Sequence, residues 1–144
     1  MNPIFISSEV VSLDNNLLIR LMLKKIFLIR HAEAGSLNAG MKDFDRPLTA
    51  SGVRDATHLG QYLAKKDIIP DYFLSSSSLR TQQTSEEIAI QIKYETKKVS
   101  FKDRLYEPSV RELLAELNQL SEGEKVLLVT HNPSVTYLAE YLSC

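Results

Sequence analysis

Two short, uninterrupted apolar runs constrain the fold of this chain more than any other feature. Residues 26–29 read IFLI, and residues 126–129 read VLLV. A strand with one solvent-exposed face alternates apolar and polar residues, so continuous apolar runs of this length predict strands that are buried on both faces. Such strands are typical of parallel sheets covered by helices. The chain is therefore predicted to build an α/β fold around a largely parallel sheet.

Segments with helical periodicity separate the predicted strands. In the first of them, Thr49 is a candidate N-cap, and small or apolar residues recur at helical spacing to form the inner face. This inner face comprises Val53, Ala56, Gly60 and Leu63. The expected order is a strand at 25–30, a helix at 49–66, a strand at 72–74, a helix at 79–92, a weaker strand at 97–101, a helix from Ser109 to Gly123, a strand at 126–129 and a helix opened by Pro133.

Charge and composition exclude several classes of function. The 144 residues carry 17 Lys and Arg against 18 Asp and Glu, a net charge of -1, which gives no argument for a nucleic-acid partner. No apolar run reaches the ~18–20 residues that a membrane span needs, and the N-terminus lacks the basic segment of a signal peptide. We therefore expect a cytoplasmic protein without a membrane partner. Cys144 is the sole cysteine, which excludes an internal disulfide.

The N-terminal segment stands apart from the predicted domain. Residues 1–21 show no clear period, and Met22 directly precedes the first strand. Two interpretations stay open: translation starts at Met22, or residues 1–21 are a genuine extension packed on the domain. The domain itself is expected over residues 22–144. The sequence does not define the oligomeric state.

Chemistry-bearing residues follow each of the predicted strands. In open α/β sheets, ligands bind beyond the carboxyl ends of the strands, so these residues are candidates for one shared site. They are Arg30 and His31, the serine run 75–78 with Arg80, Glu107, and His131 with Asn132. Guanidinium groups suit a phosphate dianion, because each donates two parallel hydrogen bonds. A histidine among such charges is kept neutral and can attack phosphorus without a metal.

Four motifs, in this order along the chain, resemble the histidine phosphatase superfamily, which includes the phosphoglycerate mutases. Within that superfamily, the Arg-His-Ala-Glu form of the first motif is similar to the SixA-like branch, the phosphohistidine phosphatases. Ala32 stands where many members have glycine. The motifs are LIRHAEA at 28–34, DRPLT at 45–49, SSSSLRTQQT at 75–84 and VTHN at 129–132. One Arg-His pair is a weak signal, whereas four motifs in order are specific.

The resemblance implies a three-layer α/β/α sandwich of the phosphoglycerate mutase type and a role for each matching residue. His31 would be the nucleophile, and Arg30, Arg46, Arg80 and His131 would hold the phosphoryl oxygens. Glu107 is evenly balanced between a general acid and an ordinary loop carboxylate. Glu33 could contact the site or a loop partner. No metal ligands and no cofactor are expected. Family domains usually continue past the last helix with a further strand segment, so two interpretations stay open: a complete domain, and one that is incomplete after Cys144.

The implied function is that of a phosphatase that works through a covalent phosphohistidine intermediate. The expected substrate is phosphohistidine on a signalling protein of the histidine phosphotransfer type. One alternative is a phosphomonoesterase of the same family that acts on a small phosphorylated metabolite. The other is a catalytically silent module that binds phosphate or phosphohistidine. His58 lies opposite the predicted inner face of its helix, so we expect it to be exposed and inert.

Overall fold

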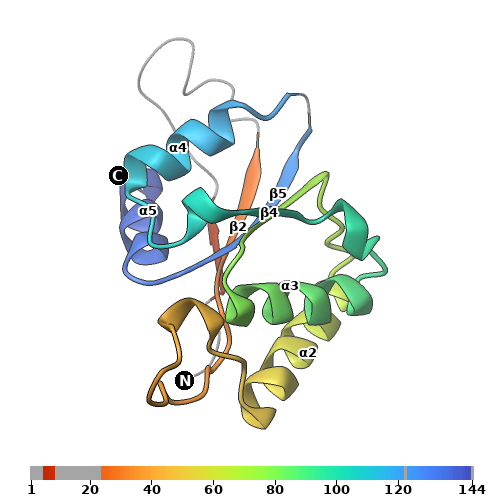
Figure 1. Ribbon diagram of the computed structural model, residues 1–144. Coiled ribbons are helices and arrows are strands. Elements are labelled where there is room, and N and C mark those ends of the chain that lie inside the picture. Colours follow the sequence, from red (N-terminus) through yellow and green to blue (C-terminus); the bar gives the residue numbers. More distant parts are fainter. Residues whose placement is uncertain (1–4, 9–23, 122, 144) are drawn as a thin grey trace.

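The computed structural model describes residues 5–8, 24–121 and 123–143. Its centre is a sheet with the strand order β1-β2-β5-β3-β4 (Figure 1). The last four of these strands are parallel, and β1 pairs antiparallel with β2 at one edge. This arrangement confirms the predicted, mostly parallel sheet. The strands are β1 (Phe5–Ser8), β2 (Lys25–Arg30), β3 (Tyr72–Ser76), β4 (Ser100–Lys102) and β5 (Lys125–Thr130).

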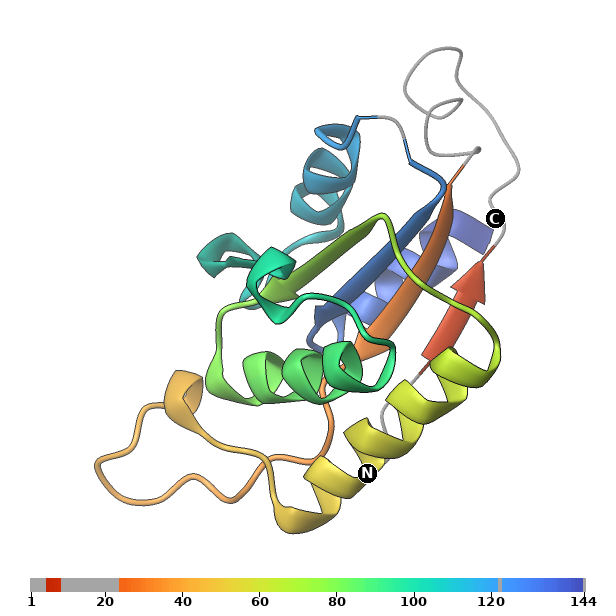
Figure 2. The same ribbon diagram turned by 90° about the vertical axis from the view of Figure 1, so that its right-hand side faces the viewer.

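Helices cover both faces of the sheet (Figure 2). One face carries α2 (Ala50–Lys65) and α3 (Leu79–Gln91), and the other carries α4 (Val110–Asn118) and α5 (Ser134–Ser143). Successive side chains of a strand point to opposite faces. In β2, Phe27 accordingly belongs to the core under α2 and α3, whereas Leu28 belongs to the core under α4 and α5. The three-layer α/β/α sandwich is therefore confirmed.

Caps and a charged side chain set the helix ends. The Thr49 hydroxyl accepts a hydrogen bond from the Gly52 N–H, and Ser109 forms a capping box with Glu112, so both predicted N-caps are confirmed. The predicted end of the third helix was wrong, because α4 stops at Asn118. Beyond the helix, the buried Lys24 Nζ donates hydrogen bonds to the carbonyls of residues 121 and 123, at 2.8 Å each.

Two further predictions were wrong in detail. Val53 does not belong to the inner face of α2, since its exposed fraction is 36%. The helix is rotated so that Gly52, one residue earlier, is buried together with Ala56. The strand predicted at 97–101 begins only at Ser100, because Thr96–Lys98 forms a 3-10 turn first.

The N-terminal segment is described only in part. Residues Phe5–Ser8 pair with residues 26–29 of β2 and form the edge strand β1. The interpretation that translation starts at Met22 concerns residues outside those that the structure describes. Within the described residues, no helix combines the length and apolarity needed to cross a membrane.

Candidate active site

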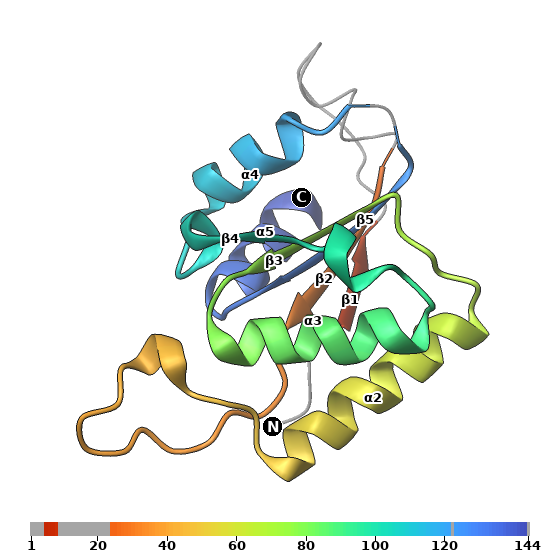
Figure 3. The same cartoon turned by 45° about the vertical axis from the view of Figure 1, so that its right-hand side comes forward.

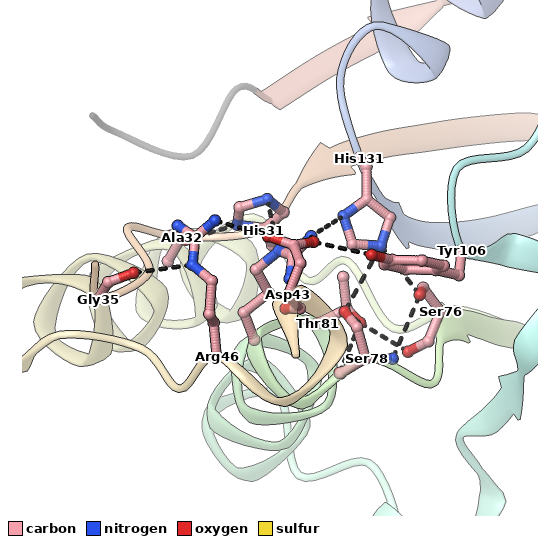
Figure 4. A network of polar contacts seen from close by, with 11 residues as sticks. His31, Ala32, Gly35, Asp43, Arg46, Ser76, Ser78, Thr81, Tyr106 and His131 are labelled. Atoms are coloured by element: carbon pink, nitrogen blue, oxygen red, sulfur yellow. Dashed lines mark hydrogen bonds and ion pairs between the residues drawn. The ribbon is translucent and has the colours of Figure 1, made fainter. Parts of the chain in front are cut away.

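Two histidines meet where the parallel strands end (Figure 4), and hydrogen bonds from one arginine connect them. His31 directly follows β2, His131 directly follows β5, and Arg80 lies in the first turn of α3. The ring centroids of the two histidines are 5.2 Å apart. Arg80 joins them, because its Nε donates to His31 Nε2 at 3.2 Å and its Nη2 donates to His131 Nδ1 at 3.4 Å. The structure thus brings these three predicted site residues together.

The hydrogen bonds of His31 select one tautomer. Its Nδ1 lies 2.7 Å from the carbonyl oxygen of Ala32. A carbonyl oxygen only accepts hydrogen bonds, so Nδ1 carries the ring proton. The lone pair of the neutral ring is therefore on Nε2, the atom that receives the hydrogen bond from Arg80. Nε2 is therefore the ring nitrogen that is chemically able to act as a nucleophile.

The surroundings of His31 keep its imidazole neutral. Burial, which is the largest cause, and the charges of Arg80, Arg30 and Arg46 together lower the pKa of His31 from 6.5 to about 4, against the opposing effect of the Ala32 hydrogen bond. Desolvation and nearby cations both disfavour a second proton on the ring. At neutral pH, His31 consequently presents an unprotonated Nε2, which accepts the hydrogen bond from Arg80, beside cationic side chains.

His131 has the opposite tautomer. Arg80 can only donate, so Nδ1 of His131 accepts and its Nε2 carries the proton. That N–H donates to the Oγ of Ser76 at 2.9 Å, at the end of β3. Burial lowers the pKa of His131 to about 3, and the charge of Arg80 contributes. The Tyr106 ring packs edge-on against the His131 ring, at a centroid distance of 5.3 Å, and fixes its orientation.

His31 also opens onto a small cavity of about 320 Å³. Arg46 is held at this cavity by a hydrogen bond from its Nε to the Gly35 carbonyl, at 2.8 Å. Arg80 and His131, both almost completely buried, adjoin the cavity through His31. The lining residues are Arg30, His31, Ala32, Glu33, Ala34 and Arg46. Three guanidinium groups therefore surround one neutral imidazole, an arrangement that suits a tetrahedral oxyanion.

Sequence reasoning missed Asp43. This residue begins a 3-10 helix, Asp43–Asp45, in the loop between β2 and α2, beside the start of α3 (Figure 3). Its Oδ1 accepts from Arg46 Nη1 at 2.7 Å, and its Oδ2 accepts from Arg80 Nη2 at 2.9 Å and from the Tyr106 hydroxyl at 2.8 Å. The hydrogen bond from Tyr106, together with those from the two arginines, holds the pKa of this carboxyl well below its usual range. The spacing of three residues between Asp43 and Arg46 was the only signal in the sequence.

Glu107 lies at a second, open groove of about 600 Å³. It is exposed, and its backbone has a φ of 50°, a conformation that L residues rarely adopt. Asn132 lines the same groove. Glu107 follows Tyr106 and Asn132 follows His131, so the groove adjoins the histidine cluster along two chain segments. The groove is lined by Glu107, Pro108, Ser109, Val110, Glu112, Asn132, Pro133, Ser134 and Tyr137.

Glu33 connects the cavity to the start of α2. Its side chain accepts a hydrogen bond from the Thr49 hydroxyl at 2.8 Å, and its carbonyl accepts from the Thr49 N–H at 2.9 Å. Gly52 lies so close that a Cβ there would be 2.1 Å from the Glu33 carbonyl oxygen. Glu33 therefore fixes the loop after His31 to the capped end of a helix. His58 is exposed on α2, as predicted.

Within residues 5–8, 24–121 and 123–143, no three His, Cys, Asp or Glu side chains are grouped closely enough to hold a metal ion. The arrangement instead gathers cationic donors around a neutral nucleophilic nitrogen. Phosphoryl transfer depends mainly on positioning and charge stabilisation, and guanidinium groups can supply both.

Comparison with known proteins places this site in a family. The chain belongs to the histidine phosphatase superfamily (branch 1), whose sequence profile matches residues 26–111. Among curated proteins, it is 29% identical over 116 residues to an uncharacterized Mycobacterium tuberculosis protein, a match that covers 80% of this chain and 70% of the relative. It is 32% identical over 69 residues to an uncharacterized chloroplastic protein of Arabidopsis thaliana. That match covers 48% of this chain and only 32% of the plant protein.

Solved structures with the same fold include SixA proteins. A protein assigned as phosphohistidine phosphatase SixA in Agrobacterium tumefaciens superposes with a TM-score of 0.76 at 28% identity, over 81% of this chain and 74% of that one. The protein histidine phosphatase SixA, solved in complex with tungstate, superposes with a TM-score of 0.71 at 28% identity, over 78% of this chain and 72% of that one. The resemblance to this family stated from the motifs is thereby confirmed.

Proposed function

We propose that the chain is a phosphatase that works through a phosphohistidine formed on His31 Nε2 and needs no metal. The observation that carries the proposal is the state of this ring: the Ala32 carbonyl fixes the proton on Nδ1, and Nε2 faces Arg80. In the first step, Nε2 attacks phosphorus and the bond from phosphorus to the leaving group breaks. In the second, water attacks phosphorus, the bond to Nε2 breaks and inorganic phosphate leaves.

The cations around His31 would stabilise the transferring group. Arg30, Arg46 and Arg80 supply the positive charge that the equatorial oxygens require in the transition state. His131 would donate to a phosphoryl oxygen through a proton that it now shares with Ser76. The Ala32 carbonyl stabilises the positive charge that His31 acquires once it carries the phosphoryl group, because it accepts the Nδ1 hydrogen bond.

The proposed substrate is phosphohistidine on a protein of the histidine phosphotransfer type, in the cytoplasm. Similarity to SixA proteins supports this choice, as does the open groove beyond Tyr106 and His131, which can accept the chain around a phosphorylated side chain. Glu107 lines that groove and is the candidate donor of a proton to the leaving nitrogen; solvent or the substrate imidazole are the alternatives. Hydrolysis of a small phosphorylated metabolite remains the competing function.

A single-turnover assay, quenched with alkaline detergent because phosphohistidine hydrolyses in acid, tests the proposal. The substrate is a ³²P-labelled phosphohistidine protein, compared with a phosphoserine peptide and with p-nitrophenyl phosphate. The wild type is expected to carry transient acid-labile label and to release phosphate, whereas His31→Ala should carry none. His58→Ala is the matched control, because it removes an exposed imidazole from α2. Folded wild-type protein that neither takes up label nor releases phosphate would refute the phosphatase and favour a silent phosphate-binding module.

A further inference from the structure

Asp43 contacts the same donors that the proposed function assigns to the phosphoryl oxygens. Its carboxylate bridges Arg46 Nη1, at 2.7 Å, and Arg80 Nη2, at 2.9 Å. Carboxylates and phosphoryl groups are both oxyanions that accept charge-assisted hydrogen bonds from guanidinium groups. A phosphoryl group bound by these two arginines must therefore compete with a carboxylate of the protein itself.

The hydrogen bonds of Arg80 make this competition direct. A guanidinium has five N–H donors. Arg80 uses Nε for His31, Nη1 for the Asp43 carbonyl, and Nη2 for both the Asp43 carboxylate and His131. Four donors are thus engaged, so a phosphoryl group that binds before His31 Nε2 attacks gains two bonds from Arg80 only by displacing one of these partners.

The Asp43 carboxylate is the partner best able to leave. Its side chain is 36% exposed, whereas that of Arg80 is 6% exposed. His131 is 3% exposed and is held by Ser76 and by packing against Tyr106. A side-chain rotation can move the carboxylate of Asp43 into solvent, where water replaces its hydrogen bonds. The ring of His131 has no comparable access to solvent.

We propose that Asp43 is a built-in competitor for the arginines that bind the phosphoryl group. Its carboxylate holds Arg46 and Arg80 in place, yields them to the incoming phosphoryl group and takes them back as inorganic phosphate leaves. The identity of the displacing group as a phosphoryl group rests on the proposed function. Asp43 is a positioning residue in this scheme, and its effect is to weaken the hold on the product.

Asp43→Asn tests the proposal, because it removes the charge and keeps the shape. The probes are inorganic phosphate and tungstate, titrated by calorimetry at neutral pH. Both are expected to bind on the order of tenfold more tightly to the variant, since the charge-assisted bonds of the competitor are weakened. Asp45→Asn is the matched control: it removes an exposed carboxylate from the same 3-10 helix, and its Kd should change by less than about twofold.

A purely structural role of Asp43 predicts the opposite sign. If Asp43 only oriented the arginines, Asp43→Asn would misplace them and weaken the binding of both oxyanions. A double variant sharpens the comparison, because the tightening caused by Asp43→Asn should shrink when Arg46 is already Gln. Tyr106→Phe provides a second route should Asp43→Asn fold poorly. It removes one hydrogen bond that holds Asp43, at 2.8 Å, and should also tighten oxyanion binding, by a smaller factor.

Binding and turnover separate this proposal from the proposed function. The proposal that Asp43 competes is overturned if folded Asp43→Asn and Tyr106→Phe bind the oxyanions as weakly as the wild type or more weakly. It is also overturned if no form of the protein binds an oxyanion. If Asp43→Asn binds oxyanions more tightly but the wild type hydrolyses no substrate, the role of Asp43 as a competitor is supported and the proposed phosphatase function is refuted. If both hold, KM and kcat should fall together in Asp43→Asn, because a tightly held product limits turnover.

Discussion

His31 and His131 should make the folded chain lose stability as the pH falls below 6.5. Their pKa values are lowered from 6.5 to about 4 and about 3, chiefly by burial. Below pH 6.5 the unfolded chain binds a proton on each imidazole, whereas the folded chain keeps both neutral. Because the unfolded state binds more protons, the free energy of unfolding decreases with decreasing pH. The contribution is complete above pH 6.5 and is lost as the pH falls towards 4 and then 3.

The size of this effect follows from the two pKa values. A pH of 5 lies roughly 1.5 pH units below the ordinary pKa of an imidazole in the unfolded chain. Each pH unit of this difference corresponds to about 1.36 kcal/mol. Each histidine therefore costs up to about 2 kcal/mol at pH 5, and the two together up to about 4 kcal/mol. That is a large part of the ~5–15 kcal/mol by which domains are stable.

Urea denaturation at pH 7 and pH 5 measures the effect. His131→Gln keeps a hydrogen-bonding side chain but cannot titrate. We therefore expect its free energy of unfolding to change between pH 7 and pH 5 by about half as much as that of the wild type. His58→Gln, altered at an exposed position of α2, should keep the whole difference. If His131→Gln showed the full wild-type difference, the assignment of a neutral, buried His131 would be wrong.

Three further outcomes are expected. Arg80→Lys should lower kcat/KM by about two to four decades, measured at steady state, because one ammonium replaces a guanidinium fork that makes several charge-assisted bonds. Gly52→Ala should lower the free energy of unfolding by about 1–3 kcal/mol, since its Cβ would lie 2.1 Å from the Glu33 carbonyl oxygen. Gly35→Ala should lower the free energy of unfolding much less in the same urea titration, because its Cβ would lie 3.7 Å from the nearest atom, the Pro47 carbonyl oxygen. Activity should persist as the pH falls through 6.5 and decline only towards pH 4, where His31 gains its proton; a decline centred near pH 6 would contradict a pKa of about 4.

The fold was largely predictable because burial on both faces leaves a clear mark in sequence. The runs at 26–29 and 126–129 became neighbouring central strands, with Leu28 opposite Leu128 in the register. The rotation of α2 was harder to predict. It depends on Gly52, which allows the Glu33 backbone to approach, and close approach of a backbone to glycine leaves no hydrophobic pattern.

The site was predictable only where its residues follow strands. His31 and His131 occupy such positions, and the parallel sheet brings them to one edge. Asp43 and Tyr106 lie in a long loop and after a 3-10 turn, so their meeting depends on tertiary packing. No periodicity connects residues that are 63 positions apart in the chain.

The pairing of β1 with β2 determines which backbone segment forms this edge of the sheet. An edge strand exposes unpaired N–H and C=O groups, which can template pairing with another chain. Residues Phe5–Ser8 cover the backbone of residues 26–29, one of the most apolar segments of the molecule. A shorter chain that began at Met22 would leave that edge uncovered, and two such chains could join their sheets edge to edge. With β1 present, Phe5–Ser8 forms the edge instead, and β2 is paired on both sides.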